Sequence, residues 1–358
     1  MSEKLPVLEV DGLKTHLFLK RGIVKAVDGV SFTLAEGETL GLIGESGSGK
    51  TMTGLSILGL LPRPAGRIVE GSVRLDGREL VGLDEAVLAK EIRGKKVSMI
   101  SQDPMTSLNP VFTVGEQVAA PLLAHGVARR RGDALDMAVG ELERVRVPSA
   151  AIRARDYPHQ FSGGMRQRVV AAMAIACRPR LLIADEPTSA LDVTIQLQFM
   201  DLIEEIQNDT GASLLFITHD LGVAASLCHR IAVMYAGRIV ETADVKTLYA
   251  APRHPYTQGL LDSLPRLGQR RKRLSSIAGS PPNPLDLPSG CPFHPRCPHA
   301  MDVCRTSPPP ELALGNGHRV SCWLDSDAPS PIALSGDTSG GTSADRRSPR
   351  RSQGGEPA

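Results

Sequence analysis

The sequence has few aromatic residues and no excess of charge of either sign. Aromatic residues make up 3% of the 358 positions, and Lys and Arg number 41 against 39 for Asp and Glu, which leaves a net charge of +2. A near-neutral chain offers no electrostatic basis for bulk binding to nucleic acid. Scarce aromatic residues also argue against stacking on single-stranded bases. We therefore expect no nucleic-acid partner.

Long hydrophobic runs are missing as well. No apolar run reaches the roughly 18 residues that a membrane-spanning helix needs. The N-terminal residues MSEKLPVLEV lack the charged and then apolar pattern of a signal peptide. Hydrophobic residues at 41% and charged residues at 22% are typical of a globular protein. These features predict a protein that starts in the cytoplasm.

Proline and cysteine are scarce in residues 1–251 and concentrated after them. Residues 1–251 hold 10 of the 27 prolines and two of the six cysteines. Alternating strand-like and helical runs there predict a mixed α/β domain. Residues 252–324 are proline-rich, contain the other four cysteines and have too few periodic apolar residues for a large core. Residues 325–358, rich in Ser, Gly, Pro, Asp and Arg, are expected to form a disordered tail.

Hydrophobic patterns give the expected elements of the first domain. The expected strands are Thr39–Ile43, Lys96–Ile100, Leu181–Ala184, Ser213–Thr218 and Arg230–Met234. The expected helices are Lys50–Leu60, Gly163–Ala176, Ile195–Thr210 and Leu221–Cys228. The tract VMYAGRIVE predicts a hairpin with its turn at Ala236–Gly237.

A phosphate-binding loop is the strongest signal in the chain. Consecutive residues match the pattern G-x-x-x-x-G-K-[ST] between an expected strand and an expected helix: Gly44, Glu45, Ser46, Gly47, Ser48, Gly49, Lys50 and Thr51. Glycines let backbone N–H groups turn toward the β-phosphate, and the helix N-terminus adds a favourable dipole. Lys50 is expected to reach the β- and γ-phosphates of ATP, and Thr51 to bind Mg²⁺.

Two acids follow the strand expected at Leu181–Ala184. Buried strands rarely finish in this way unless the carboxylates meet a cation or a reacting water. Asp185 suits a role on or near Mg²⁺, and Glu186 suits the general base for the attacking water. The alternative is an acidic N-cap for the next helix, which the phosphate-binding loop disfavours.

A pair of glycines opens another expected helix. Ser162 is a natural N-cap, and Gly163 and Gly164 expose backbone N–H groups to an anion. At this position in the chain, the element resembles the signature sequence of the ATP-binding cassette (ABC) family, and the resemblance covers residues 7–251 nearly throughout. Its other motifs are Gln102 (Q-loop), Ser189-Ala190-Leu191-Asp192 (D-loop) and His219 (H-loop).

The ABC resemblance implies a P-loop NTPase fold with a RecA-like core, an antiparallel β subdomain and a helical signature subdomain. It implies two cassettes packed head to tail, with ATP held between the Lys50 loop of one and Ser162–Gly164 of the other. His219 would contact the γ-phosphate and position the water, and Gln102 would sense Mg²⁺ and couple to a membrane partner. An aromatic residue usually stacks on the adenine, and Phe18 is the candidate.

Several features resemble the D-type ATPase subunits of bacterial peptide importers of the dipeptide, oligopeptide and nickel class. They are the runs Ser101–Pro110 and His254–Thr257, the signature FSGGMRQR, and a match from Pro281 to Trp323 with that family's C-terminal extension. The resemblance implies two transmembrane permease subunits, a paralogous second ABC ATPase subunit and, indirectly, an extracytoplasmic peptide-binding protein. It implies a peripheral protein on the cytoplasmic face of the cell membrane that couples ATP hydrolysis to peptide import.

Three other functions stay open. One is a soluble ABC ATPase that acts on DNA or ribosomes, although such proteins normally carry coiled-coil insertions or two cassettes in one chain. Another is the import of a different solute, such as nickel. The third is a regulatory binding module in which ATPase activity is secondary.

The cysteine cluster carries its own chemistry. Cys291, Cys297, Cys304 and Cys322 leave gaps of five, six and seventeen residues, without the C-x₂₋₄-C pairs of most structural zinc sites. Disulfides are disfavoured in a reducing cytoplasm. Four thiolates on proline-stiffened loops suit a 4Fe–4S cluster, which the importer resemblance also implies. Free thiols are one alternative, and zinc, with the added candidate ligands His294, His299 and His318, is the other.

Overall fold

The structure, a computed structural model, describes residues 6–189, 191–264 and 276–326. These residues belong to one compact unit that extends to Ser326. The boundary expected at residue 251 therefore does not separate two compact units, because the described residues after it pack in the same unit as those before it. The tail expected at 325–358 lies outside the described residues from position 327 onward.

The described residues contain two sheets and the helices that pack on them. The strands are β1 (Leu8–Leu19), β2 (Gly22–Leu34), β3 (Thr39–Ile43), β4 (Gly66–Leu75), β5 (Arg78–Glu79), β6 (Val97–Ile100), β7 (Leu181–Asp185), β8 (Ser213–Thr218), β9 (Arg230–Tyr235), β10 (Arg238–Asp244), β11 (Glu311–Gly315) and β12 (His318–Ser321). The α-helices are α1 (Lys50–Leu58), α2 (Glu85–Val87), α3 (Pro104–Ser107), α4 (Val114–Ala124), α5 (Arg131–Arg144), α6 (Ala150–Arg153), α7 (Gly163–Ile175), α8 (Val193–Thr210), α9 (Leu221–Leu227), α10 (Val245–Ala250), α11 (Pro255–Asp262) and α12 (Asp302–Thr306). Short π or 3-10 turns are η1 (Leu88–Ile92), η2 (Pro158–Gln160) and η3 (Trp323–Asp325).

The larger sheet carries the phosphate-binding loop. Its strands lie in the order β11-β12-β10-β9-β3-β8-β7-β6. The neighbours from β9 to β6 run parallel to one another. Every residue of β3, β7 and β8 is buried. Parallel strands that are covered on both faces read as continuous apolar runs, which is why the sequence pattern locates them.

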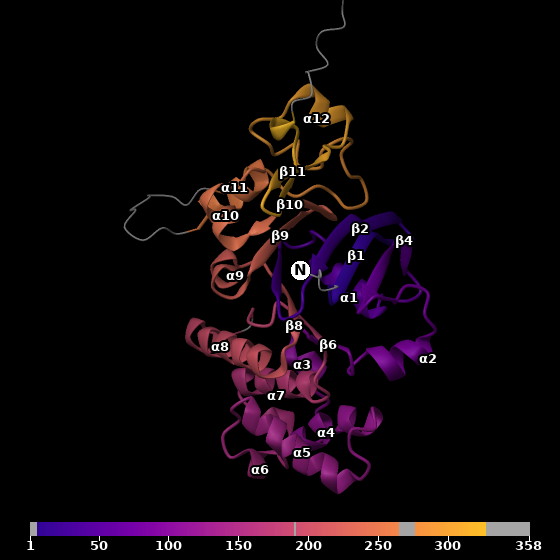
Figure 1. Ribbon diagram of the computed structural model, residues 1–358, viewed down its shortest axis with the longest axis vertical. Coiled ribbons are helices and arrows are strands. Elements are labelled where there is room, and N and C mark those ends of the chain that lie inside the picture. Colours follow the sequence, from indigo (N-terminus) through magenta and orange to yellow (C-terminus); the bar gives the residue numbers. More distant parts are fainter. Residues whose placement is uncertain (1–5, 190, 265–275, 327–358) are drawn as a thin grey trace, which may run out of the picture. The chain divides into compact units, whose positions relative to one another are not determined.

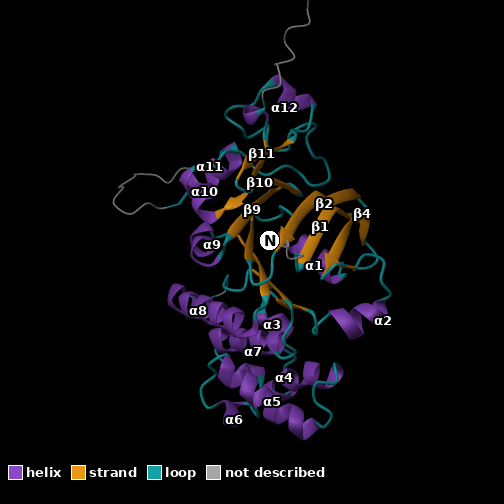
Figure 2. Ribbon diagram, viewed as in Figure 1, coloured by secondary structure: helices purple, strands orange, loops and turns teal. Residues whose placement is uncertain are grey.

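Alternate residues of these strands face two different hydrophobic cores. Leu182 and Phe216 belong to the core that includes α7 and α8. Ile183 and Ile217 belong to the core shared with α1 and the antiparallel sheet β2-β1-β4-β5. The central strands thus hold the two cores together. Figure 1 shows α4, α5, α6 and α7 gathered together, and Figure 2 shows β1, β2 and β4 as a separate group of strands.

This architecture confirms the expected fold class. The RecA-like core, the antiparallel β subdomain and the helical signature subdomain are all present, and all expected strands and helices have ends within two residues of those observed. Helix α1 ends at Leu58 because Gly59 adopts a left-handed conformation, with φ 63°, that caps the helix. The turn expected at Ala236–Gly237 joins β9 to β10, and both of its residues have positive φ.

Residues 276–326 extend the larger sheet and share its core. Strand β12 pairs antiparallel with β10, where Val320 lies opposite Glu241, and β11 pairs with β12. Phe293 is buried beside Tyr235 of β9 and Tyr256 of α11, with ring centroids 5.2 Å and 5.4 Å away. A segment with few apolar residues of its own is thereby stabilised by the core of the larger sheet.

Buried polar side chains complete this junction. Glu241, which is 1% exposed, accepts hydrogen bonds from the backbone N–H groups of Arg253 and His254, and it lies 2.9 Å from Nε2 of His318. Nδ1 of His254 accepts a hydrogen bond from the Tyr256 N–H and caps α11. Burial lowers the pKa of His254 to about 3, so this ring is neutral in the folded protein at ordinary pH.

We expect acid to destabilise the protein partly through His254. Its pKa is about 3 when folded against an ordinary 6.5, so the unfolded chain binds a proton that the folded chain excludes. The stability present above pH 6.5 is therefore lost progressively as the pH falls toward 3. Between about pH 7.5 and 5.5, the free energy of unfolding measured in urea should fall by about 1 kcal/mol more in the wild type than in His254→Asn. The Asn side chain keeps an acceptor that can cap the helix but does not titrate.

The exposed residue His159 provides the matched control. His159→Asn should lose as much stability as the wild type over the same pH range. An equal loss in His254→Asn would show that the buried ring does not carry this acid sensitivity.

Candidate nucleotide-binding site

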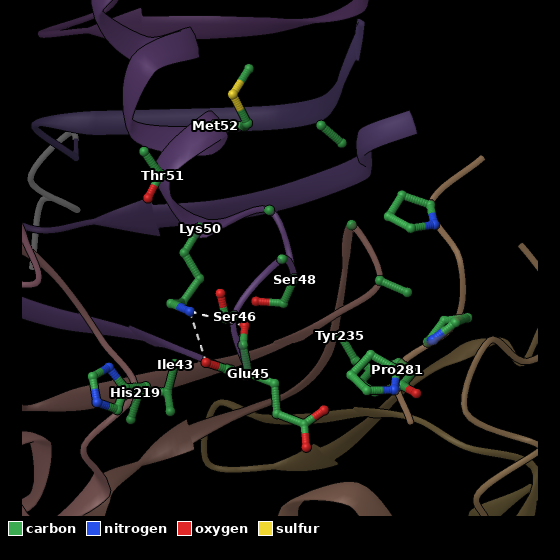
Figure 3. Close-up of a pocket in the computed structure, with 18 of the residues that line it drawn as sticks. Ile43, Glu45, Ser46, Ser48, Lys50, Thr51, Met52, His219, Tyr235 and Pro281 are labelled. Atoms are coloured by element: carbon green, nitrogen blue, oxygen red, sulfur yellow. Dashed lines mark hydrogen bonds between the residues drawn. The ribbon is translucent and has the colours of Figure 1, made fainter. Parts of the chain in front are cut away.

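A cavity of about 730 Å³ opens at the carboxyl end of β3. Residues 43–52 all line it, and Gln102, Glu186 and His219 lie on its wall. The phosphate-binding loop therefore borders a space of the size that small-molecule sites have. Figure 3 shows how the labelled side chains of this loop surround the cavity.

Two glycines give the loop its path because no side chain fits at their positions. A Cβ atom on Gly44 would lie 2.1 Å from the carbonyl oxygen of Met234. A Cβ atom on Gly49, whose φ is 107°, would lie 2.2 Å from the carbonyl oxygen of Ala26. Gly49 then serves as the N-cap of α1, so the loop leads directly into the N-terminus of a helix.

Polar groups inside the loop are suited to phosphate. The Lys50 ammonium, whose side chain is 5% exposed, donates hydrogen bonds to the carbonyl oxygens of Gly44 at 2.7 Å and Glu45 at 3.1 Å. Burial lowers the pKa of Lys50, while Glu186 opposes that shift from 3.8 Å. The hydroxyl of Ser48 is buried without a partner among the described residues. A phosphate group would satisfy both side chains.

Thr51 and Asp185 meet where Mg²⁺ is expected. The Thr51 hydroxyl lies 3.2 Å from Oδ1 of Asp185 and donates to it, although the two residues come from α1 and β7. Burial raises the pKa of Asp185, with Lys50 and Thr51 opposing the shift. A hydroxyl and a carboxylate are oxygen ligands that Mg²⁺ prefers, so this pair fits the ion.

Glu186 is the centre of the expected catalytic group. Its carboxylate lies 3.2 Å from Nδ1 of His219 and accepts a hydrogen bond of 3.4 Å from the Gln102 amide. Its backbone has a left-handed φ of 46° and is held by an N–H···O bond of 2.8 Å to Ile217. The structure thus brings Lys50, Gln102, Glu186 and His219 together, because each follows the carboxyl end of a neighbouring parallel strand.

The signature residues lie elsewhere. Ser162 and Gly163 are exposed at the N-terminus of α7, where the Ser162 hydroxyl accepts a hydrogen bond of 3.4 Å from the Met165 N–H. Gly164 is close-packed, since a Cβ atom there would lie 2.8 Å from Ile195. Ser162, Gly163 and Gly164 do not line the cavity that holds the phosphate-binding loop.

The D-loop motif connects the acid pair to α8. The Ser189 hydroxyl donates to the carbonyl oxygen of Glu186, and the Asp192 side chain caps α8 by accepting from the N–H groups of Thr194 and Ile195. This cap explains why α8 begins earlier than the sequence pattern indicates. Ala190 lies outside the described residues.

Phe18 is not placed with the other candidate nucleotide residues. It lies near the end of β1, is 40% exposed, and packs under the Arg67 guanidinium at 5.2 Å from its ring centroid. It does not line the cavity. Sequence reasoning missed the residues that do line this side, namely Val24, Lys25, Ala26, Tyr235, Ala236, Gly237, Leu260, Pro281, Pro282, Pro284 and Leu287. For the residues from Pro281 to Leu287, the high proline content was the only signal in the sequence, and proline content does not identify a ligand.

The four clustered cysteines are neighbours in the structure. Cys304 and Cys322 are buried, and Cys291 and Cys297 are partly buried. Burial raises the pKa of Cys322 to about 12, and the nearby thiols Cys291 and Cys297 add to the shift. In the part of the chain that the structure describes, no group of three or more His, Cys, Asp or Glu side chains is arranged to hold a metal ion.

Comparisons with known proteins agree with this geometry. A family model for ABC transporters matches residues 27–189, and a model for the C-terminal region of oligopeptide and dipeptide transporters matches residues 240–304. Among solved structures, the dimeric cassette MJ0796 in a post-hydrolysis state with ADP and Pi is 27% identical with a TM-score of 0.59, covering 66% of this chain and 98% of that one. Among the described residues, no helix is both long enough and apolar enough to cross a lipid bilayer.

Named relatives match over nearly their whole length. The oligopeptide transport ATP-binding protein AppD of Bacillus subtilis is 48% identical, and the match covers 89% of this chain and 96% of that protein. The oligopeptide transport ATP-binding protein OppD of Salmonella typhimurium is also 48% identical, with 88% and 93% covered. The chain therefore belongs to the ATP-binding subunits of the ABC transporters that import oligopeptides and dipeptides.

Proposed function

We propose that this chain hydrolyses ATP in a site that it shares with a second cassette, and that the reaction drives peptide import. One observation carries this proposal. Ser162 and Gly163 are exposed outside the cavity that contains the phosphate-binding loop. A second cassette packed head to tail would bring its own signature helix N-terminus to the γ-phosphate. The similar cassette MJ0796, which is dimeric in its solved structure with ADP and Pi, supports the pairing of two cassettes.

The residues around the cavity support in-line attack of water on ATP. Glu186 would accept the proton of the attacking water, and His219 would hold that water against the γ-phosphate. Lys50 would bind the phosphate oxygens, and ADP would leave as the new P–O bond forms. Thr51 and Asp185 would hold Mg²⁺, which would supply positive charge to stabilise the triphosphate. Gln102, hydrogen-bonded to Glu186, would sense the ion and the water.

The proposal includes partners that supply what a cassette lacks. Peptide importer ATPases of this family work with membrane permeases. We infer two transmembrane permease subunits, a paralogous second ATPase subunit and an extracytoplasmic peptide-binding protein that acts through the permease. The chain would bind peripherally at the cytoplasmic face of the membrane. Closure of the two cassettes on ATP, and their reopening after hydrolysis, would then drive alternating access in the permease.

We also propose, in keeping with a D-type subunit, that Cys291, Cys297, Cys304 and Cys322 hold a 4Fe–4S cluster. Burial raises the pKa of Cys291, Cys297 and Cys322, and backbone N–H groups of Phe293, His299 and Leu324 oppose the shift. Such N–H groups stabilise thiolates and tune iron–sulfur centres. Neighbouring thiols that are not arranged around a single ion are compatible with the wider spacing of a four-iron cluster. Its role would be to fasten a segment that has little core of its own.

Replacing the general base separates ATP binding from hydrolysis. Glu186→Gln should lower ATP turnover by about 100-fold or more, because proton transfer to the base is lost, while leaving ATP bound. Light scattering of the variant mixed with its partner cassette and ATP should then show a stable closed dimer. Glu205→Gln, at an exposed position on α8, is the control and should turn over as the wild type does. Unchanged turnover in Glu186→Gln refutes the assigned base.

The cluster predicts a coloured protein. Anaerobic purification should give a brown preparation that contains about four iron atoms per chain and absorbs blue light. Cys322→Ser should lose the colour and the iron, whereas Cys177→Ser, outside the cluster, should keep both. A colourless wild type with stoichiometric zinc would overturn the proposal.

A further inference from the structure

The nucleotide cavity has two chemically different sides. Figure 3 shows His219 on one side of the loop that holds Lys50, and Tyr235 and Pro281 on the other side. Glu186 lies 3.2 Å from His219, which marks the side where the γ-phosphate reacts. A nucleotide whose phosphates lie along the loop therefore extends its base toward Pro281.

An apolar wall from the extension stands on that side. Pro281, Pro282, Pro284 and Leu287, here called the proline wall, line the cavity together with Val24 and Ala26 of β2. Leu287 and Pro282 are partly buried, and Pro281 and Pro284 are exposed. Proline rings and leucine methyl groups present flat apolar surface, which is what the face of a base needs in order to leave water.

The described cavity lining offers no exposed aromatic side chain of Phe, Tyr or Trp as an alternative. Tyr235 is 2% exposed, and its ring is packed against Tyr256 and Phe293. Phe18 lies outside the lining and packs under Arg67. Aliphatic surface is therefore what this side of the cavity presents to a base.

The segment that carries the proline wall is supported by a packing contact and by hydrogen bonds within it. Leu285 packs against the turn between β1 and β2, where a Cβ atom on Gly22 would lie 3.3 Å from Cδ2 of Leu285. Asn283 fixes the bend of the wall by accepting hydrogen bonds from the N–H groups of Leu285 and Asp286. The wall is thus a built surface with local support, which favours recognition of a ligand by shape.

One arginine connects the start of this segment to the phosphate-binding loop. Arg296, whose side chain is 4% exposed, donates two hydrogen bonds to the Glu45 carboxylate, at 2.7 Å and 3.0 Å. It donates a third, at 3.1 Å, to the carbonyl oxygen of Ala278, three residues before Pro281. Arg296 therefore fixes the position of the proline wall relative to the phosphate-binding loop. A site that binds both the base and the phosphates of one nucleotide requires such a fixed position.

We propose that the proline wall is the base-binding surface for the nucleoside triphosphate, taking the place that Phe18 was expected to fill. The inference rests on the proposed function, because it assumes that the loop binds the phosphates. It makes the C-terminal extension part of the ATP site: the cassette core supplies the groups that act on phosphate, and the extension supplies the surface that distinguishes a nucleotide from a bare polyphosphate.

The test compares ligands with and without a base. Isothermal titration on the full-length chain with Mg²⁺ would measure Kd for ADP and for inorganic tripolyphosphate, neither of which requires the dimer. Pro282→Ser combined with Leu287→Asn should weaken ADP about tenfold, since apolar contact with the base is lost, and should leave tripolyphosphate unchanged. Phe18→Ala and Leu314→Asn, the latter at an exposed position on β11, should both bind ADP as the wild type does.

Each other outcome counts against the proposal. Equal weakening of ADP and tripolyphosphate would mean that the double variant disturbs the loop and not a base contact. Loss of ADP affinity in Phe18→Ala, with none in the double variant, would return the base to Phe18. A wild type that binds neither ligand would overturn the proposed function itself, and the inference with it.

Discussion

The site depends above all on the parallel pairing of β6, β7, β8 and β3. In-register parallel strands end at one edge of a sheet, so whatever follows each of them meets the others. Gln102, Glu186 and His219 follow three of these strands, and the phosphate-binding loop follows the fourth. Because all residues of β3, β7 and β8 are buried, slippage of one strand would move apolar side chains out of both cores and would separate the catalytic group.

A second constraint is the packing between the C-terminal extension and the cassette, in which each part stabilises the other. Its strand β12 completes hydrogen bonds along β10, and Phe293 fills the core beside Tyr235. In the other direction, Tyr256 accepts a hydrogen bond of 2.9 Å from the Glu45 N–H. The phosphate-binding loop is therefore shaped from two sides, by the strand that precedes it and by residues more than two hundred positions later in the chain.

What could be predicted from the sequence follows from how local each feature is. The Lys50 loop, the cap at Ser162 and the buried parallel strands are encoded in short runs of residues, and the structure places them as expected. The contacts between the extension and the larger sheet are not local in the sequence. Glu241 and His318 are 77 positions apart, so no short run of residues predicts their contact. Strand β11 is largely exposed, so hydrophobic periodicity does not predict that it joins the sheet. Phe18 was expected to stack on the adenine, but where its ring lies depends on how β1 packs against β4, which places Arg67 over it.

Glu45 shows why the loop and the extension cannot vary independently. The Glu45 backbone N–H donates a hydrogen bond to the Tyr256 hydroxyl and is therefore not free to bind phosphate. Phosphate must be bound by the residues that follow Glu45. Its carboxylate is neutralised by Arg296; without that partner a negative charge would stand at the entrance of a site for a polyanion. Arg296 directly precedes Cys297 in the chain. The segment that carries the cysteines therefore also sets the charge and the position of the first residues of the phosphate-binding loop.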